Sequence, residues 1–329
     1  MTIPMALSRP RQKSLPQAPL LAGLPKGVLS PSTLCITIMA LVHLLSLNVQ
    51  EFRSPDKQRE VMHFARAQGV DILFLQETNL RYSREVSDFK SRFCVHPFFS
   101  LTTSVSCGVG VVFVNSSFRT GAHCIYGIDG RTLAVDFYLG SRRVRAVVVY
   151  APARRSDSSS FFNLLDSFLL DSYPCFLVGD FNCVLDPVRD VRGPGQGRPY
   201  AGARSLRDIC IQFSLTDAWV QLHGDSFGAT WERGRSASRL DKFLFPRELD
   251  CCLVSCDVLA FPPGTPRISD HRPLSAVLDV GGSAPRVDAW RMDPCLLTDW
   301  SSMTSIERAL GDPVGGAESA NTWDELKLA

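Results

Sequence analysis

Short runs of apolar residues recur along the middle of the chain, and polar stretches separate them. The runs are rich in β-branched and aromatic residues, which is typical of buried strands. They predict strands at residues 70–76, 108–114, 144–150 and 175–178, followed by 238–245, 254–261 and 273–280. Between residues 132 and 138 apolar and polar positions alternate more regularly, so we expect a strand there with one exposed face.

Other segments carry the spacing of an amphipathic helix. Ser54, Pro55 and Asp56 offer an N-cap, a favoured first residue and an acid near the positive end of the helix. An apolar face follows them, and Gly69 predicts the end of this helix. Residues 159–170 and 203–213 predict two more helices. Many strands with a few helices between them indicate a mixed α/β sandwich, in which helices flank two sheets.

The same pattern divides the chain into three parts. Residues 1–33 contain basic residues and no acid, and their prolines interrupt the helix that a mitochondrial presequence needs, so we expect a disordered leader. Residues 34–282 contain all the predicted elements and are expected to form one domain. Residues 283–329 contain no usable motif, and we interpret them as a linker or a truncated downstream segment.

Composition narrows the class of protein. The chain has 35 Lys and Arg, 33 Asp and Glu and a formal net charge of +2, which excludes a histone-like protein but not an enzyme that binds nucleic acid through local clusters. Its 11 irregularly spaced cysteines favour a reduced intracellular protein, nuclear or cytoplasmic. The longest apolar stretch, residues 34–47, is shorter than the about 20 residues that span a bilayer, so we expect no membrane helix and no secretory signal.

Polar side chains stand at the ends of several predicted strands. One Asn or Asp after a strand is an ordinary turn residue, but a whole set at strand ends predicts a single cleft held by a rigid scaffold. The set consists of Asn48, Glu77, Tyr150, Asp180, Asn182, Asp241, Asp270 and His271.

The chemistry of this set is consistent with one reaction. Its carboxylate and amide oxygens are hard ligands that suit Mg²⁺, or Mn²⁺ as an alternative, better than Zn²⁺. His271 can act as a general acid or base, or bind a phosphate oxygen when protonated. Together they predict metal-assisted attack of water on a phosphate ester. The Gly-rich residues 192–202 lack the end of a P-loop, and we expect no small organic cofactor.

The ordered segments LN, QET, YAP, GDFN, RLD and SDH resemble the endonuclease/exonuclease/phosphatase superfamily. This superfamily includes exonuclease III, apurinic/apyrimidinic endonucleases, DNase I and inositol-polyphosphate 5-phosphatases. The resemblance runs from about residue 44 to residue 280. It implies a DNase I-like α/β fold, a four-layered sandwich of two mixed sheets flanked by helices.

The resemblance also implies which residues hold the metal. Asn48 and Glu77 would hold it, Glu77 directly. Asp180 would orient or deprotonate the attacking water, and Asn182 would support the scissile phosphate. Further candidate metal ligands are Asp180, Asn182, Asp270 and His271.

The remaining residues receive roles around the phosphate. Tyr150 would contact it or stabilise charge in the transition state. Asp270 would orient His271, which meets the phosphate. Asp241 would assist the leaving group or hold the hydrogen bonds of the site.

Within the superfamily, Tyr150 in the segment VVYAP favours the exonuclease III and apurinic-endonuclease side. The segments SLNVQEFRSPDKQREV, VDILFLQET, ATW and SRLDKFLF are most similar to endonuclease domains of LINE-type retrotransposons. Gln50, Glu51 and Lys242 depart from the common pattern, and Glu51 replaces a frequent glycine. The resemblance implies a monomeric domain that nicks DNA and leaves a 3′-hydroxyl. Alternatives are a phosphatase on a small phosphoester or phosphoinositide, and a degenerate domain that binds nucleic acid without cutting.

Arginines cluster in the loops near the predicted strand ends, where we expect them to contact the DNA phosphate backbone. These are Arg154, Arg155, Arg189, Arg192, Arg198, Arg204, Arg207, Arg233, Arg235 and Arg239. Arg142, Arg143 and Arg145 lie at a predicted hairpin away from those ends. For these three we expect an ordinary solvated surface.

Overall fold

The fold is taken from a computed structural model that describes residues 41–102, 107–128, 130–262 and 268–281. The predicted leader and the predicted C-terminal segment lie outside the described residues, so the domain boundaries stay predictions. Within the described ranges, no helix combines the length and the apolar character that crossing a bilayer requires.

The first sheet contains six strands in the order β14-β15-β1-β2-β4-β3. They are β1 (Leu41–Asn48), β2 (Ile72–Gln76), β3 (His96–Ser100), β4 (Val109–Phe113), β14 (Leu253–Val258) and β15 (Leu274–Asp279). Strands β1 and β2 are parallel, and the other neighbours are antiparallel. The sheet is therefore mixed.

The second sheet also has six strands, in the order β10-β13-β8-β7-β6-β5. They are β5 (His123–Tyr126), β6 (Thr132–Leu139), β7 (Arg142–Tyr150), β8 (Cys175–Asp180), β10 (Leu215–Asp217) and β13 (Asp241–Pro246). Here β7 and β8 are the parallel pair. A small third sheet joins β11 (Trp231–Arg233), β12 (Ser236–Ser238) and β9 (Val191–Arg192).

Alternation along the strands places three apolar layers. Phe74 of β2 and Phe176 of β8 point between the two large sheets, and their rings meet edge to face at 6.2 Å. Their neighbours Leu73 and Leu177 point outward into two separate clusters. Because both faces of each sheet are buried, the strands read as continuous apolar runs.

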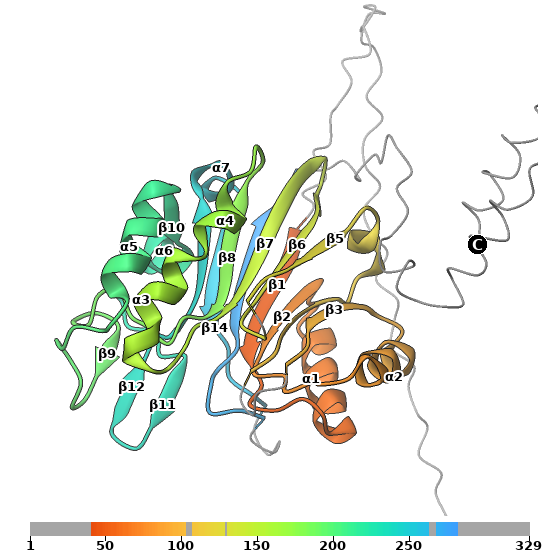
Figure 1. The fold of residues 1–329 in the computed structure, drawn as a ribbon, viewed down its shortest axis with the longest axis horizontal. Coiled ribbons are helices and arrows are strands. Elements are labelled where there is room, and N and C mark those ends of the chain that lie inside the picture. The colour runs from red at the N-terminus through yellow and green to blue at the C-terminus, as the bar shows by residue number, and fades with distance from the viewer. Residues whose placement is uncertain (1–40, 103–106, 129, 263–267, 282–329) are drawn as a thin grey trace, which may run out of the picture. The chain divides into compact units, whose positions relative to one another are not determined.

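Helices cover the two outer faces and complete the sandwich (Figure 1). Helices α1 (Pro55–Ala67) and α2 (Ser83–Phe93) pack on the first sheet, and α3 (Arg155–Asn163), α4 (Asp166–Leu169) and α5 (Ala203–Gln212) pack on the second. The shorter helices are η1 (Ser116–Arg119), α6 (Ala218–His223) and α7 (Arg247–Asp250). The predicted α/β sandwich of two mixed sheets flanked by helices is confirmed.

One strand is more buried than its sequence indicates. Asp136 on β6 is 2% exposed and accepts hydrogen bonds from Arg145 at 2.6 Å and from Arg143 at 2.7 Å. The polar position that predicted an exposed face is therefore buried together with its counter-charges. Arg145, for which a solvated surface was expected, is likewise buried.

The topology brings the ends of the strands that carry the predicted site residues to one edge. Parallel strands end side by side, so the ends of β1 and β2 are neighbours, and so are those of β7 and β8. The antiparallel strand β13 begins opposite the end of β8, with Asp241 beside Asp180. Strand β15 begins close to the end of β1, with Leu274 beside Ser46. Polar residues at these termini consequently meet at one edge of both sheets.

Candidate active site

A buried asparagine joins the carboxylates of the two sheets. The Asn48 side chain is fully buried at the end of β1. Its Nδ2 donates to Glu77 Oε1 at 2.8 Å and to Asp180 Oδ2 at 3.0 Å, while its Oδ1 accepts from the Gln50 backbone N–H at 3.1 Å. Asn48 therefore holds the two carboxylates at a fixed separation.

The backbone turns sharply directly after the strands that carry these residues. Gln50, Glu51, Glu77 and Asn182 all have positive φ, with Glu51 at 116°. Each such non-glycine residue costs about 1–3 kcal/mol, and such residues concentrate at functional sites. Gly179 next to Asp180 has a different constraint, because a Cβ there would lie 2.1 Å from the Val149 carbonyl oxygen.

His271 and Asp241 form a buried pair. His271 Nδ1 lies 2.8 Å from Asp241 Oδ2, and its Nε2 lies 3.8 Å from Asp180 Oδ2. The Asp241 backbone N–H donates to Thr230 Oγ1, and the His271 backbone N–H donates to Ser269 Oγ. Both sides of the pair are thus anchored, with Nε2 directed toward Asp180.

Asp270 does not orient His271, contrary to the predicted role. Its Oδ2 accepts from Trp231 Nε1 at 3.1 Å, and its backbone N–H donates to Gln50 Oε1 at 3.2 Å. Asp241 orients the ring instead, because the register of β13 against β8 brings it opposite the site. Asp270 belongs to the rim, where it connects the His271 loop to the turn after β1.

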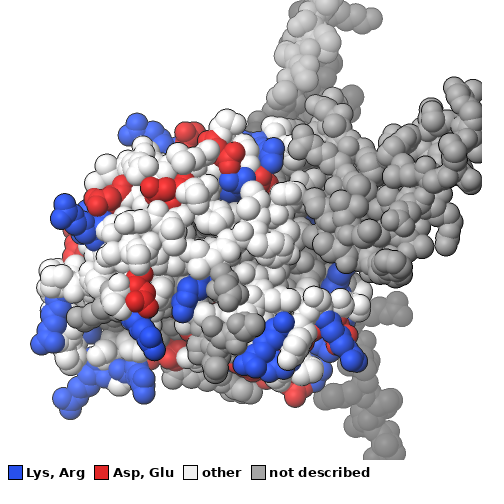
Figure 2. Space-filling model, in the orientation of Figure 1, with Lys and Arg blue, Asp and Glu red and all other residues white. Residues whose placement is uncertain are grey.

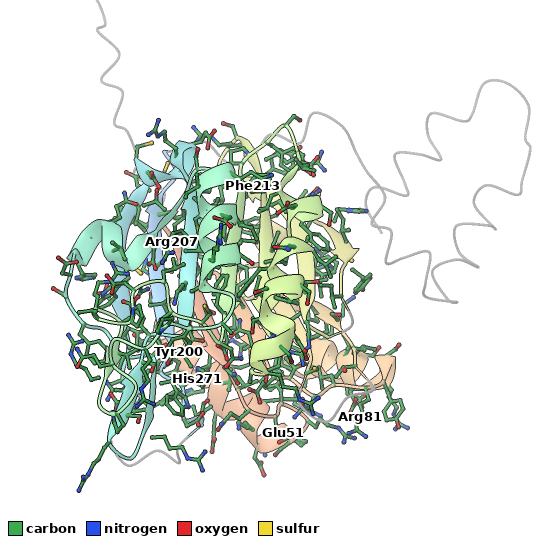
Figure 3. The ribbon with its side chains drawn as sticks, turned by 60° about the vertical axis from the view of Figure 1, so that its left-hand side comes forward. Glu51, Arg81, Tyr200, Arg207, Phe213 and His271 are labelled. Carbon is green, nitrogen blue, oxygen red and sulfur yellow. The ribbon has the colours of Figure 1, made fainter. Side chains whose placement is uncertain are left out.

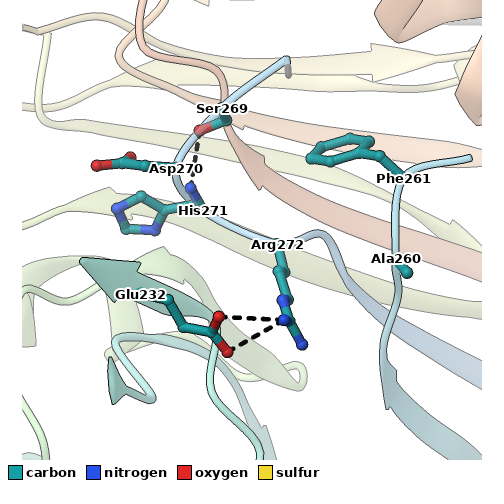
Figure 4. A pocket seen from close by; sticks show the side chains of 7 residues that line it. All are labelled: Glu232, Ala260, Phe261, Ser269, Asp270, His271 and Arg272. Atoms are coloured by element: carbon teal, nitrogen blue, oxygen red, sulfur yellow. Dashed lines mark hydrogen bonds and ion pairs between the residues drawn. The ribbon is translucent and has the colours of Figure 1, made fainter. Parts of the chain in front are cut away.

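A cavity of about 350 Å³ adjoins His271. Figure 4 shows His271 and Asp270 on one side of it, Phe261 on another, and the Glu232–Arg272 ion pair across from them. In Figure 3, His271 and Glu51 lie near the same lower edge of the domain. The site is therefore open to a ligand at this edge.

Charge at the site is unbalanced, and this moves the pKa values. Burial, with a contribution from Asp241, raises the pKa of Asp180 to about 6, although His271 opposes the rise. Burial lowers the pKa of His271, but Asp241 and Asp180 outweigh it and raise the pKa to about 10. Burial, Glu77 and Asp180 raise the pKa of Tyr150 far above its ordinary value. At neutral pH the His271 ring is therefore cationic and Tyr150 is a neutral phenol.

The donor set fits a hard divalent cation. Asp180 and Asp241 are buried beside each other, and Asp241 Oδ1 has no hydrogen-bond partner. Asp180, Asp241 and His271 present ligand atoms within 4.8 Å of one another. His271 Nδ1 is engaged by Asp241, so the carboxylates of Asp180 and Glu77 are the better-placed oxygen ligands.

Asn182 supports Asp180. Its backbone N–H donates to Asp180 Oδ1 at 2.9 Å, and its Nδ2 donates to the Ala151 carbonyl oxygen at 2.9 Å. Tyr150 ends β7, beside Asp180 at the end of β8. The structure therefore brings together seven of the eight predicted residues as neighbours and places Asp270 at the rim.

The predicted arginines divide into buried and exposed groups. Arg239 is fully buried and donates to Asp190 and Asp217, so its predicted contact with DNA is wrong. Arg189 is paired with the same Asp190 at 2.9 Å, and the buried Lys242 Nζ donates to the Arg239 carbonyl oxygen. The exposed group contains Arg154, Arg198, Arg204, Arg207, Arg233 and Arg235.

Two exposed arginines stand beside the site. Arg233 and Arg235 belong to the hairpin of β11 and β12, and Trp231 at its start forms a β-bridge with His271. Figure 2 shows Lys and Arg side chains gathered along the lower edge, where Figure 1 places β11 and β12. This edge carries positive charge around an acidic centre.

Sequence analysis missed three polar contacts of the site. Thr230 holds the Asp241 backbone, Trp231 binds Asp270, and Arg131 contacts Tyr150. The segment ATW contains Thr230 and Trp231, and its similarity to retrotransposon domains was the one signal available for them. Arg131 lies in a turn with no distinguishing pattern.

Comparisons with known proteins agree with this arrangement. The model of the Endonuclease/Exonuclease/phosphatase family matches residues 45–271. The transposon TX1 uncharacterized 149 kDa protein of Xenopus laevis is 29% identical over 271 residues, which are 79% of this chain and 20% of that protein. The chain thus spans about a fifth of the length of this relative. The predicted resemblance to the superfamily is confirmed, and the chain is similar to a transposon protein.

Solved structures share the fold. An AP endonuclease from Archaeoglobus fulgidus has a TM-score of 0.60 and 19% identity, covering 72% of this chain and 99% of that one. A variant of the 3′ phosphatase NExo from Neisseria, bound to a product DNA hairpin, has a TM-score of 0.60 and 18% identity, covering 72% and 99%. The Xenopus laevis APE2 catalytic domain has a TM-score of 0.61 and 17% identity, covering 75% and 94%. With more than half of its length matched by the family model, the chain belongs to the endonuclease/exonuclease/phosphatase family.

Proposed function

We propose that this protein is a divalent-metal-dependent endonuclease of retrotransposon origin that nicks DNA and leaves a 3′-hydroxyl. The observation that carries the proposal is the buried Asp180 facing the His271–Asp241 pair at 3.8 Å. An anionic base beside a cationic imidazole suits attack of water on a phosphodiester. The transposon relative and the DNA-bound Neisseria structure support DNA as the substrate.

Asp180 would accept the proton of the attacking water. Its pKa of about 6 leaves it ionised at neutral pH yet closer to the pH of the reaction than an ordinary carboxyl, which favours general-base action. Asn182 holds one of its oxygens and Asn48 holds the other. These contacts fix the direction in which Asp180 accepts the proton.

His271 would bind a non-bridging phosphate oxygen through Nε2–H. Asp241 occupies Nδ1 and keeps the ring cationic, so the positive charge is present before the substrate arrives. Tyr150 supplies a second donor, because its raised pKa keeps the hydroxyl protonated. Fixed donors at the phosphate stabilise the charge that builds up in the transition state.

Glu77 and Asp180 would hold the metal, with Asn48 setting their separation. When bound, Mg²⁺ or Mn²⁺ would polarise the phosphate and neutralise its developing charge. We expect one protein chain to suffice, and no organic cofactor to be needed, since every proposed role belongs to a residue of this chain at the shared edge of the two sheets.

Nicking of supercoiled plasmid tests the proposal. With Mg²⁺ we expect nicked circles that EDTA abolishes, and we expect Asp180→Ala and His271→Ala each to lower the rate by at least about 100-fold. The matched control is Asp88→Asn, which removes an exposed carboxylate on α2 and should leave the rate unchanged. No nicking by the wild-type protein, or equal nicking by all variants, would overturn it.

Assays of phosphoester hydrolysis and of DNA binding on the same protein test two other activities. The cavity beside His271 could hold a small phosphoester, and faster hydrolysis of such an ester than of DNA would make the protein a phosphatase. Glu51 adds an acid to the turn after β1, and salt-dependent DNA binding without metal-dependent cleavage would make it a binding domain.

A further inference from the structure

Arg131, the residue before β6, is hydrogen-bonded to the backbone of Tyr150. Tyr150 ends the neighbouring strand β7. The Tyr150 backbone N–H donates to the Arg131 carbonyl oxygen at 2.8 Å. In return, the Arg131 guanidinium donates to the Tyr150 carbonyl oxygen at 3.3 Å. Two contacts of opposite direction therefore fix the last residue of β7.

The same guanidinium also holds the aromatic ring. Arg131 Cζ lies 5.2 Å from the centroid of the Tyr150 ring, within the about 6 Å over which a cation is attracted to an aromatic face. Tyr150 is only 6% exposed, and the nearby Glu77 carboxylate contributes to the raised pKa of its hydroxyl. The ring is thus fixed at its face by Arg131, with Glu77 close to the hydroxyl at its tip.

The Arg131 guanidinium contacts Tyr150, which is one of the predicted site residues. No carboxylate of the described ranges forms an ion pair with it. Its side chain is half-buried, which limits the number of rotamers it can adopt. Its interactions are therefore directed at Tyr150.

We propose that Arg131 is a positioning residue that orients the Tyr150 hydroxyl toward the reacting phosphate. The inference rests on the proposed nicking activity and adds a residue to it. A hydrogen-bond donor stabilises the transition state only at the right place, and a displacement of about 1 Å can cost about 100-fold in rate. Arg131 supplies that placement through the ring face and the backbone together.

A double-mutant cycle on the nicking reaction tests this role. The variants are Arg131→Met, Tyr150→Phe and the double substitution, with kcat and KM measured for an oligonucleotide duplex in Mg²⁺. We expect Arg131→Met to lower kcat by about 10- to 50-fold and to change KM by less than about threefold. In the Tyr150→Phe background, Arg131→Met should lower kcat by less than about twofold, because its target hydroxyl is already absent.

Two further variants separate orientation from charge and from stability. Arg131→Lys keeps the charge and should recover part of kcat. Arg119→Met, which removes an exposed arginine of η1, is the matched control and should leave kcat unchanged. If the effects of Arg131→Met and Tyr150→Phe on kcat simply multiply in the double variant, the proposal is overturned. An effect of Arg131→Met on KM alone would also overturn it. Either result would indicate that Arg131 contacts DNA independently of Tyr150.

A readout without catalysis keeps the inference distinct from the proposed function. In protein labelled with ¹³C at tyrosine Cζ, the Tyr150 resonance is assigned by its loss in Tyr150→Phe. We expect this resonance to shift in Arg131→Met and to stay in place in Arg119→Met. If the wild-type protein does not nick DNA, the proposed function fails; if the resonance does not move, the Arg131 inference fails.

Discussion

At the residue scale, the pair of His271 and Asp241 sets the charge of the site. Asp241 is the largest favourable cause of the raised pKa of His271, so Asp241→Asn should bring that pKa from about 10 toward its ordinary value of about 6.5. An NMR titration of the metal-free protein measures it. Asp88→Asn is the control and should leave the His271 titration in place; an unchanged value in Asp241→Asn would contradict the pairing.

The same pairing determines how stability depends on pH. The folded-state pKa of His271 is raised, so its contribution to stability is complete below about pH 6.5 and is lost as the pH rises through about 10. Asp241→Asn lacks most of this contribution. We therefore expect the difference in unfolding free energy between the two proteins to narrow between pH 7 and pH 10.5, as measured by urea denaturation.

Glu51 offers a second prediction at the residue scale. Its φ of 116° suits glycine, and a side chain there is strained. Glu51→Gly should be about 1 kcal/mol more stable to urea than Glu51→Ala, because both lose the carboxylate and only glycine loses the strain. Equal stability of the two variants would show that the turn carries no strain.

Glu51→Gly and Glu51→Ala should both bind DNA more tightly than the wild type, since an acid leaves the turn beside the cleft.

At the scale of elements, the hairpin of β11 and β12 is the rim that we expect to meet DNA. Arg233 and Arg235 are exposed on it, and Trp231 ties its first strand to His271. Each arginine that contacts a phosphate contributes about 0.9 to the slope of log Kd against log salt concentration. We expect Arg233→Gln and Arg235→Gln each to lower the slope by that amount in fluorescence anisotropy. Arg142→Gln, at the first residue of β7 and so at the opposite end of that strand from Tyr150, should not change it.

Elements were predictable where the pattern was simple. Strands β2, β4, β7 and β8 are buried on both faces, so their sequences are continuous apolar runs bounded by polar residues. Helix α2 was not predicted from the sequence. Among its described side chains, only Phe89 and Phe93 are buried. The burial of both faces of β6 was not predicted. Asp136 is neutralised there by arginines, and their pairing with it depends on the register of the β6–β7 hairpin.

The candidate site follows the same division. Residues at the carboxyl ends of parallel strands could be predicted to meet, because their place depends on the strand alone. The carboxylate that pairs with the His271 ring could not be predicted. Asp270 is adjacent to His271 in the sequence, whereas Asp241 reaches the ring only through the register of β13 against β8. Arg239 was misjudged for a related reason, since its partners Asp190 and Asp217 lie on two other segments.

At the scale of the whole molecule, the first and the last described strands of the predicted domain pair with each other. Strand β1 pairs with β15 along most of its length, from Leu41 beside Asp279 to Ser46 beside Leu274. Strand β15 also pairs with β14, so it lies inside the first sheet and not at its edge. The first and last described strands are therefore neighbours inside the first sheet.

We therefore expect a fragment of residues 34–282 to fold and nick DNA as the full chain does. Its urea midpoint and its nicking rate should match those of the 329-residue protein. The matched control ends at residue 272 and lacks β15, whose Leu274, Ala276 and Leu278 are fully buried. Losing three core side chains and two strand pairings exceeds the about 5–15 kcal/mol that stabilise a domain, so this control should be unfolded by circular dichroism. A 34–282 fragment that is unstable or inactive would show that residues outside this range complete the domain.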